Sequence, residues 1–345
     1  EGFYAACEKV KTSGYTVEGQ SVLPVVLHAD QWINNSLDAV ISNNFGVVPV
    51  DANGNYVHKE TTPGYKNALK FVNNLIQKGY LDVNTMTIDE TALKTYLDAK
   101  RVFCWIGNQA QQDKTNMPWV SYGPIAASNG AKPVLGKDLS AGTGWIQTLV
   151  SKDCKNPEKI AKMISWLSSK EGLMSNYYGV EGTDYTVDEK GIVTRTEEGT
   201  KTYAENYNNN IMMWPFANTS FERSTEPVPE ANTNRGEEVQ LMTAFGKGEN
   251  TYIYDSSLLS FQNSQVLEPS SDLGLKLGQV KTYLESEKTK IVTAGSDDAF
   301  EKEYQSMLDT LDSYSIKEID AEYDKVYKEY CEKKGTSIED VNADL

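Results

Sequence analysis

The sequence predicts an α/β protein that is built as two lobes. The chain has 345 residues, which exceeds the usual size of a single domain. Short apolar runs typical of buried strands alternate with longer segments of helical period, and this order is typical of layered α/β folds. We found no internal repeat and no low-complexity tract in the sequence.

Start and stop signals define the helices. The segment 61–81 has Thr62 as a cap residue and Pro63 at the first helical position, and Gly79 ends it. The segment that begins at Asn156 has the same pattern, and we assign its Trp166 to the core. The other predicted helices cover residues 1–14, 88–100, 296–315 and 315–335.

The predicted strands are short. Apolar and β-branched residues favour strands at 21–27, 45–50, 101–107 and 144–150. The Gly and Asn content of 51–57 and 188–193 is typical of tight hairpin turns. The segment 195–275 is different, because it is rich in Asn, Pro and aromatic residues and reads as long functional loops.

Composition excludes several classes of function. The net charge of −16 disfavours nucleic acid and anionic membranes as partners, since both would repel the chain. The apolar runs are far shorter than the roughly 20 residues that a membrane helix needs. The four cysteines, at 7, 104, 154 and 331, are widely spaced, and we interpret them as free thiols.

Motifs for catalysis and for cofactors are missing from the sequence. HExxH, the P-loop and GxSxG do not occur, and GTGW at 142–145 lacks the third glycine of a dinucleotide loop. We therefore predict no cofactor and no metal ion. A hydrolase that uses paired carboxylates stays open as an alternative, because 49 Asp and Glu residues place some pair close in space.

The aromatic inventory indicates sugar binding. The chain has 6 Trp and 20 Tyr. Proteins hold a sugar by stacking an aromatic ring on its C–H face and directing planar polar groups at its hydroxyls. Tryptophan occurs beside such polar groups in four segments, ADQW (29–32), WIGNQAQQ (105–112), SAGTGW (140–145) and MWPFANTSFER (213–223).

One motif resembles a known family. YYGVEGTDYTVDEKGIV (177–193), after a helix that ends in SWLSSKEG, resembles the Y-G-x-E-G-x-x-Y-x-x-D-x-x-G signature of family 1 extracellular solute-binding proteins, the carbohydrate receptors of bacterial ABC importers. GYKNALKFVNNLIQKGYLD and KIVTAGSDDAFEKEYQSMLDTL resemble further segments of the same family in the same order. The resemblance extends over nearly the whole chain.

The resemblance implies a two-lobe periplasmic-binding-protein-like (type II) fold that closes on its ligand. It implies that residues 1–135 belong to the second lobe, 136–180 return to the first lobe, and 181–345 complete the second lobe. The family's N-terminal portion has no counterpart here, so we expect an incomplete first lobe and a lipid anchor outside these residues.

The resemblance also implies a function and a location. We expect an extracellular, cell-surface receptor that binds an oligosaccharide between its lobes and delivers it to the transmembrane permease subunits. A receptor for a peptide or another solute stays open as an alternative. Composition and position in the family pattern together give these candidate binding residues: Asp30, Trp32, Trp105, Asn108, Gln109, Trp145, Glu181, Trp214 and Arg223.

Overall fold

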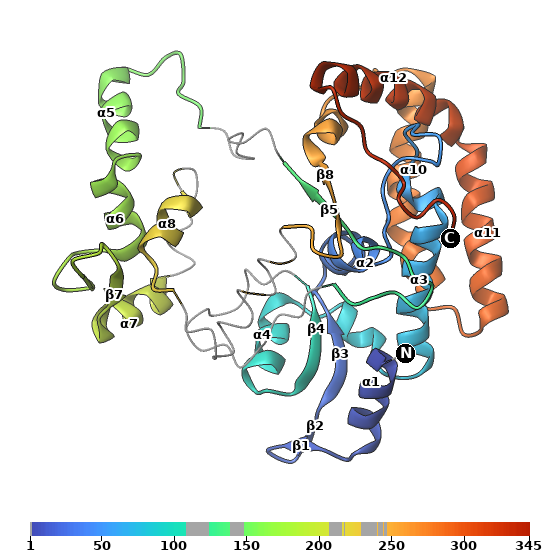
Figure 1. The fold of residues 1–345 in the computed structure, drawn as a ribbon, viewed down its shortest axis with the longest axis horizontal. Helices are drawn as coiled ribbons and strands as arrows, with labels where there is room; N and C mark the ends of the chain where they lie inside the picture. Colours follow the sequence, from blue (N-terminus) through green and yellow to red (C-terminus); the bar gives the residue numbers. More distant parts are fainter. Residues whose placement is uncertain are drawn as a thin grey trace. The chain divides into compact units, whose positions relative to one another are not determined.

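The chain divides into two compact units. Unit 1 comprises Glu1–Ser140 and Glu238–Leu345, and unit 2 comprises Ala141–Glu237 (Figure 1). The computed structural model describes residues 2–107, 124–138, 148–206, 218–228 and 247–345, together with Phe216, Gln240 and Ala244. Residues 181–237 thus group with 141–180 and not with the C-terminal helices. Which lobe of a solute-binding fold each unit represents stays a prediction.

Unit 1 contains two pairs of parallel strands. Strand β3 (Leu23–Leu27) pairs with β4 (Val102–Ile106), and β5 (Val134–Lys137) pairs with β8 (Tyr252–Asp255). Residues 24–27 of β3 are all buried, which accounts for the apolar run in the sequence. Parallel strands need long crossover connections. Helices lie in the chain between β3 and β4 and in the chain between β5 and β8. The α/β prediction is confirmed.

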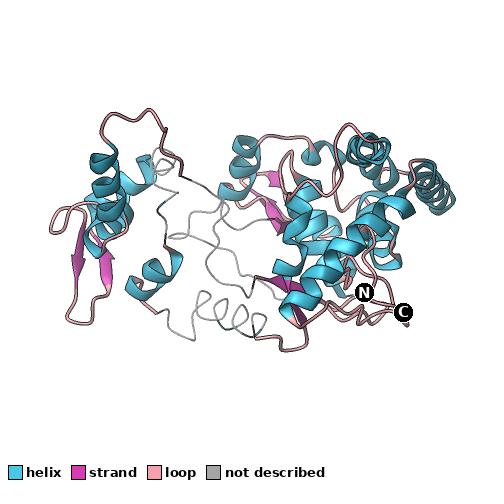
Figure 2. Cartoon of the chain, turned by 90° about the horizontal axis from the view of Figure 1, so that it is seen from above, coloured by secondary structure: helices cyan, strands magenta, loops and turns pink. Residues whose placement is uncertain are grey.

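Figure 2 shows the short strands of unit 1 beside long helices. Four long helices pack together: α10 (Asp272–Val292) and α11 (Asp297–Ser313) contact α3 (Pro63–Gln77), while α12 (Ile316–Lys334) contacts α10 and α11 (Figure 1). The remaining helices and strands of the unit are shorter. Its helices are α1 (Gly2–Thr12), η1 (Ile33–Ile41), α2 (Ser42–Asn44), η2 (Lys59–Thr61), α3 (Pro63–Gln77), η3 (Val83–Met86), α4 (Glu90–Asp98), η6 (Ser256–Asn263), α10 (Asp272–Val292), α11 (Asp297–Ser313) and α12 (Ile316–Lys334), and β1 (Thr16–Val17) pairs with β2 (Gln20–Ser21).

The start of α3 follows the prediction from sequence. The Thr62 side chain accepts a hydrogen bond from the backbone N–H of Tyr65, and Pro63 occupies the first turn. Gly79 has a φ of 65°, a conformation that glycine adopts without strain, and it follows the last turn. The buried face of α3, which includes Tyr65 and Leu69, packs into the main core of unit 1.

Unit 2 combines helices with one hairpin. Its helices are α5 (Pro157–Leu167), α6 (Lys170–Tyr178), α7 (Glu197–Asn206) and α8 (Thr219–Thr225), and its strands are β6 (Tyr185–Val187) and β7 (Val193–Arg195). The turn predicted at 188–193 joins β6 to β7. The Asp188 carboxylate accepts from the backbone N–H groups of Lys190 and Ile192, and Gly191 has a φ of 84°.

Three local predictions need correction or lie outside the described residues. Residues 45–50 do not form a strand, because Gly46 turns the chain with a φ of 71° and only Val50 makes a bridge, to Tyr56. Trp166 is not in the core, since 43% of it is exposed on α5. The strand predicted at 144–150 falls mostly on undescribed residues.

Helix α10 was not predicted from sequence. It contains Gly274 and Gly278, which lower helix propensity, and it begins inside the segment 195–275 that was predicted as long loops. That prediction is wrong for much of the segment, which also contains α7, α8, β8 and η6. Ser271 caps it by accepting from the N–H of Gly274.

All four cysteines lie in the described residues, and none of them forms a disulfide. Cys7 is fully buried in the core, and burial raises the pKa of its thiol to about 11. Burial raises the pKa of the Cys104 thiol to about 12. Such thiols stay protonated at neutral pH, which agrees with the interpretation as free thiols.

Asn73 joins two helices in the core. Its side-chain N–H groups donate to the carbonyls of Val292 (2.9 Å) and Ala294 (2.8 Å) at the end of α10, and the residue is fully buried. Replacing Asn73 by Ala would leave both carbonyls without this donor, so we expect the free energy of unfolding to fall by about 2–4 kcal/mol. Chemical denaturation of the chain measures this. Gln279→Ala, on the exposed face of α10, is the control, and an equal loss in both variants would contradict the role of Asn73.

Candidate functional site

Three of the predicted binding residues lie at or just after the carboxyl ends of β3 and β4. Leu27 at the end of β3 pairs with Ile106 at the end of β4. Asp30 and Trp32 follow β3, and Trp105 lies in the last part of β4. Ligands of open α/β sheets bind outside the carboxyl ends of the strands. The sequence clusters at 29–32 and 105–112 therefore begin at the edge where a ligand is expected.

Asp30 is strained and exposed. Its φ of 38° is unusual for a residue with a side chain, and such strain gathers at functional positions. Trp105 is half-buried and stacks on the imidazole of His28, with 6.4 Å between ring centroids and 24° between planes. Trp32 is only 5% exposed and packs in the core, so its use as a stacking platform stays a prediction.

The other predicted binding residues are not part of this cluster as described. Glu181 is exposed in unit 2, where its backbone bridges to Tyr185. Arg223 belongs to α8, but the structure does not describe its side chain. Asn108, Gln109, Trp145 and Trp214 lie outside the described residues.

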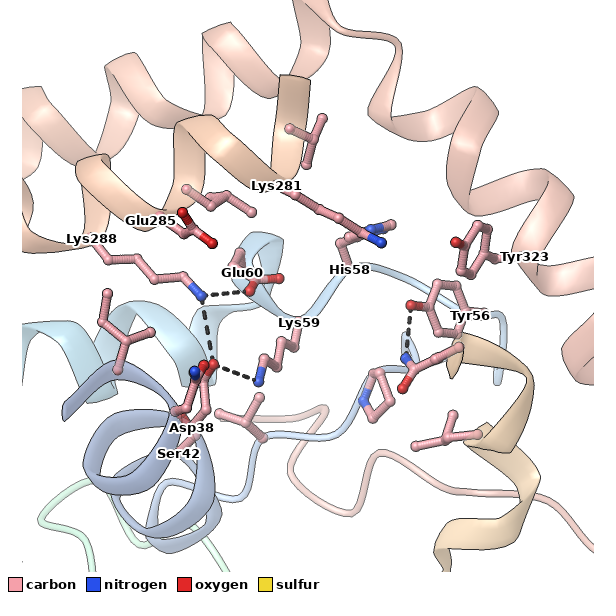
Figure 3. A pocket seen from close by; sticks show the side chains of 18 of the residues that line it. Asp38, Ser42, Tyr56, His58, Lys59, Glu60, Lys281, Glu285, Lys288 and Tyr323 are labelled. Carbon is pink, nitrogen blue, oxygen red and sulfur yellow. Dashed lines mark hydrogen bonds and ion pairs between the residues drawn. The ribbon is translucent and has the colours of Figure 1, made fainter. Parts of the chain in front are cut away.

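A cavity of about 480 Å³ lies within unit 1. Ile33 and Asn34 line it and follow Trp32 directly in the first turn of η1. The remaining walls come from residues 56–60, β8, η6, α10 and α12 (Figure 3). A volume of this size lies in the range of small-molecule sites.

A buried charge cluster forms one wall of the cavity, and we define it as Asp38, Lys59, Glu60 and Lys288. Lys288 on α10 contacts Glu60 at 2.8 Å and Asp38 at 3.6 Å, and Lys59 contacts Asp38 at 3.1 Å (Figure 3). The hydroxyl of Tyr65 donates to Asp38 at 2.8 Å. The cluster thus joins η1, η2, α3 and α10.

The pairing in the cluster decides its protonation. Burial raises the pKa of the Glu60 carboxyl, but the Lys288 and Lys59 ammonium groups outweigh burial and lower that pKa to about 2. Burial lowers the pKa of Lys288, but Glu60 and Asp38 outweigh it and raise that pKa. Glu60 and Lys288 are 6% and 5% exposed, and both are charged at neutral pH.

A further set of contacts holds the wall of the cavity that lies opposite the buried charge cluster. The ring of His58 pairs with the Asp320 carboxylate on α12, and Asp324 accepts from the backbone N–H of Tyr56 at 2.8 Å. The Tyr56 hydroxyl accepts from the side-chain amide of Gln262 at 2.9 Å (Figure 3). The Tyr56 and Tyr323 rings stack with 5.5 Å between their centroids, so each ring covers one face of the other.

The charged groups that line the cavity are balanced in sign. Among the described lining residues, three carboxylates face three ammonium groups: Asp38, Glu60 and Glu285, with Lys59, Lys281 and Lys288. Lys281 and Glu285 are exposed at the opening on α10. The cavity therefore offers both hydrogen-bond donors and hydrogen-bond acceptors without a strong net charge. In the described part of the chain, no group of three or more His, Cys, Asp or Glu is placed to hold a metal ion.

Sequence reasoning missed the cavity, because its charged residues are up to 250 positions apart in the chain (38 to 288). Asp38, Lys59, Glu60 and Lys288 each look like ordinary surface charges in the sequence. The H-K-E run at 58–60, beside the predicted turn and directly before the Thr62 cap, was a weak signal.

Removing Lys288 should expose the role of the buried charge cluster. Lys288→Met leaves the buried Glu60 and the partly buried Asp38 without their shared partner, so we expect the free energy of unfolding at neutral pH to fall by about 3–5 kcal/mol. The difference in the free energy of unfolding between the wild type and the variant should become smaller as the pH falls, because Glu60 takes up a proton more readily in the variant. In the wild type, the low pKa of folded Glu60 stabilises the chain above its ordinary pKa of 4.5, and this contribution is lost as the pH falls towards about 2.

Chemical denaturation over this pH range measures both effects. The double variant Lys288→Met/Glu60→Gln should recover part of the loss. If the loss in the free energy of unfolding in Lys288→Met does not change with pH, this result would contradict the pairing of Lys288 with Glu60.

No protein-family model and no curated protein sequence matches the chain. Solved structures do match it. A calcium-free alginate-binding protein matches over 94% of this chain and 67% of its own, with a TM-score of 0.56 and 14% identity. An HMO-binding, ABC-transporter-associated solute-binding protein from Bifidobacterium longum infantis matches over 95% of this chain and 69% of its own, with a TM-score of 0.55 and 17% identity.

A second protein from Bifidobacterium longum subsp. infantis, described as an extracellular solute-binding protein, gives the same coverage, with a TM-score of 0.56 and 15% identity. These likenesses extend over nearly all of this chain and over about two thirds of each neighbour. The predicted fold class is thereby confirmed. The chain has the α/β fold of the periplasmic and extracellular solute-binding proteins.

Proposed function

We propose that this protein is the extracellular receptor of an ABC importer and that it binds an oligosaccharide, as in family 1 of the solute-binding proteins. We assign Asp30 and Trp105 at the strand ends and the cavity of unit 1 to the ligand site. The structural neighbours support the class, because one of them is an alginate-binding protein and another is an HMO-binding protein. The HMO-binding protein is associated with an ABC transporter, which supports a permease as partner of this protein.

The observation that carries the proposal is the chemistry of the cavity. Its lining combines tyrosine rings, amides and charge-balanced ionic groups in about 480 Å³. A sugar needs a ring to stack on and both donors and acceptors for its hydroxyls. A charged end group, as in a peptide, would need an excess of the opposite charge. The described lining residues have no such excess.

A glycosidase is the alternative from another class. It needs one carboxylic acid that is protonated near neutral pH and a second carboxylate across the ligand. Glu60 does not fit the first role, because its pKa is about 2 and Lys288 occupies its carboxylate. The named neighbours are described as binding proteins.

We further propose that the protein works at the outer surface of the cell and that a lipid anchor holds it there. Among the residues that the structure describes, no helix has the length and apolar character to span a membrane. The acidic composition and the solute-binding fold support a receptor in an exposed compartment.

Calorimetric titration with a panel of oligosaccharides tests the proposal. We expect saturable binding of at least one neutral oligosaccharide and no turnover of chromogenic glycosides. Lys281→Ala should weaken that binding roughly tenfold without lowering the free energy of unfolding, because Lys281 is an exposed donor at the cavity opening. Gln279→Ala, two positions away and outside the cavity lining, is the matched control. Catalytic turnover, or no binding across the panel, would sink the proposal.

Replacing Asp30 should weaken ligand binding without lowering the stability of the protein. Asp30→Gly removes the strain of the positive φ, so we expect the free energy of unfolding to stay the same or rise by up to about 1 kcal/mol. The affinity for the oligosaccharide should fall roughly tenfold, since a charged hydrogen-bond acceptor is lost. Denaturation and titration of the same preparation measure the two effects. Unchanged affinity would remove Asp30 from the site.

A further inference from the structure

One histidine in the cavity wall is held by a buried carboxylate. His58 lines the cavity, and its ring Nδ1 pairs with Oδ1 of Asp320 on α12 (Figure 3). The backbone N–H of His58 donates to the same oxygen at 3.1 Å. Asp320 is only 9% exposed, and it is not among the residues that line the cavity. Nδ1 is therefore engaged with α12 and is not available to a ligand.

Further contacts fix the plane of the His58 ring. It lies edge-on to the ring of Tyr56, with 5.9 Å between centroids and 80° between planes. It is tilted against the ring of Tyr323 on α12, also with 5.9 Å between centroids. The carbonyl of His58 accepts from the hydroxyl of Thr61 at 2.8 Å. The backbone and the ring are thus held from both sides, and the imidazole has one orientation in the wall.

The second ring nitrogen of His58 is left open. In the described part of the chain, the side-chain contact to Asp320 goes to Nδ1, and Nε2 has no hydrogen-bond partner. Nε2 is not one of the buried polar atoms that lack a partner, so it is not sealed inside the protein. The side chain is 15% exposed and lines a cavity of about 480 Å³. The structure therefore has room for a ligand atom beside Nε2.

The contact with Asp320 decides which nitrogen carries the proton. A carboxylate oxygen can only accept, so the Nδ1 that faces it has to donate. The hydrogen bond of one ring nitrogen sets the tautomer of a histidine, and the neutral imidazole then has its lone pair at Nε2. Linked hydrogen bonds also polarise one another, so the bond to Asp320 makes Nε2 a better acceptor. A group that donates a hydrogen, such as a hydroxyl, fits this position.

We propose that His58 is a specificity-determining residue of the cavity, in which Nε2 accepts a hydrogen bond from one hydroxyl group of the bound sugar. Asp320 is the positioning residue that fixes the tautomer and the orientation of the ring. The proposal rests on the proposed function, which assigns the cavity to a sugar. A site that accepts from a hydroxyl rejects an analogue that cannot donate there, because the acceptor then stays unpaired.

The direction of this hydrogen bond can be tested with fluorinated sugars. Fluorine takes the place of a hydroxyl oxygen but has no hydrogen to donate. In a series of singly deoxyfluorinated analogues of the sugar found by titration, one analogue should bind the wild type about tenfold more weakly than the parent sugar. If every analogue binds the wild type as the parent sugar does, Nε2 accepts no hydrogen bond from the sugar.

Two variants separate the roles of the ring nitrogens. His58→Asn keeps an amide donor near the position of Nδ1 and removes Nε2. This variant should bind the parent sugar about tenfold more weakly and should not distinguish it from the fluorinated analogue. His58→Gln places its amide near the position of Nε2 and should recover part of the affinity. Gln279→Ala, outside the cavity lining, is the matched control and should bind as the wild type does.

NMR of the imidazole nitrogens observes the contact directly, because the chain has only two histidines. With isotope-labelled histidine at mildly alkaline pH, His58 of the free protein should carry its proton on Nδ1 and none on Nε2. Adding the sugar should shift the Nε2 resonance of His58 and leave His28 unchanged, since His28 does not line the cavity. In Asp320→Ala, the free protein should show both tautomers of His58, an effect that lost packing alone would not produce.

Each outcome bears on a different part of the proposal. If sugar binds without moving the His58 resonances, or if His58→Asn still distinguishes the fluorinated analogue, His58 does not determine specificity. If no sugar binds to any form, the proposed function fails, and the tautomer of free His58 still decides whether Asp320 positions the ring. A proton on Nε2 in the free protein would overturn the proposal whether or not sugar binds.

Discussion

The ion pair between Lys288 and Glu60 is the constraint on which the arrangement of unit 1 depends. It joins α10, near the C-terminal end of the sequence, to η2 in the first quarter of the chain, and Asp38 extends it to η1. Two charges this deeply buried are tolerated only while each keeps its partner. The elements that carry them therefore have to meet in one register, and the cavity forms where they meet.

This constraint also sets what the cavity can recognise. Because Lys288 and Lys59 are occupied by Asp38 and Glu60, the cluster contributes polar atoms and little net charge to the wall. The low pKa of Glu60 keeps its carboxyl ionised over the physiological range of pH, so Glu60 does not change its charge there. A fixed, charge-balanced wall beside aromatic rings is suited to a neutral polyhydroxyl ligand more than to an ion.

Much of the fold could be predicted from sequence, because its signals are local. The Thr62–Pro63 cap, the Asp188 turn and the buried run at 24–27 each lie within a few residues, and the structure confirms all three. Trp166 was assigned to the core from helical spacing. This spacing shows which residues share a face of the helix, but not whether another part of the chain packs against that face. Helix α10 was missed because its glycines weaken the local signal, although tertiary contacts hold it.

The candidate site was predictable only in part. Asp30 and Trp105 were predicted because tryptophan stands beside polar residues in the segments 29–32 and 105–112, and the structure places both residues at or just after the ends of β3 and β4. Their role in binding stays a prediction. The buried charge cluster depends on which distant residues meet, and composition does not contain that information.

The most direct test of a charge-balanced sugar site is the dependence of ligand affinity on ionic strength. For the oligosaccharide that binds in titration, the account predicts a dissociation constant that stays constant within about twofold between low salt and about 0.5 M salt, where charge interactions are screened beyond a few ångströms. An affinity that falls steeply with salt would show that the ligand is held by net charge, and it would contradict the account.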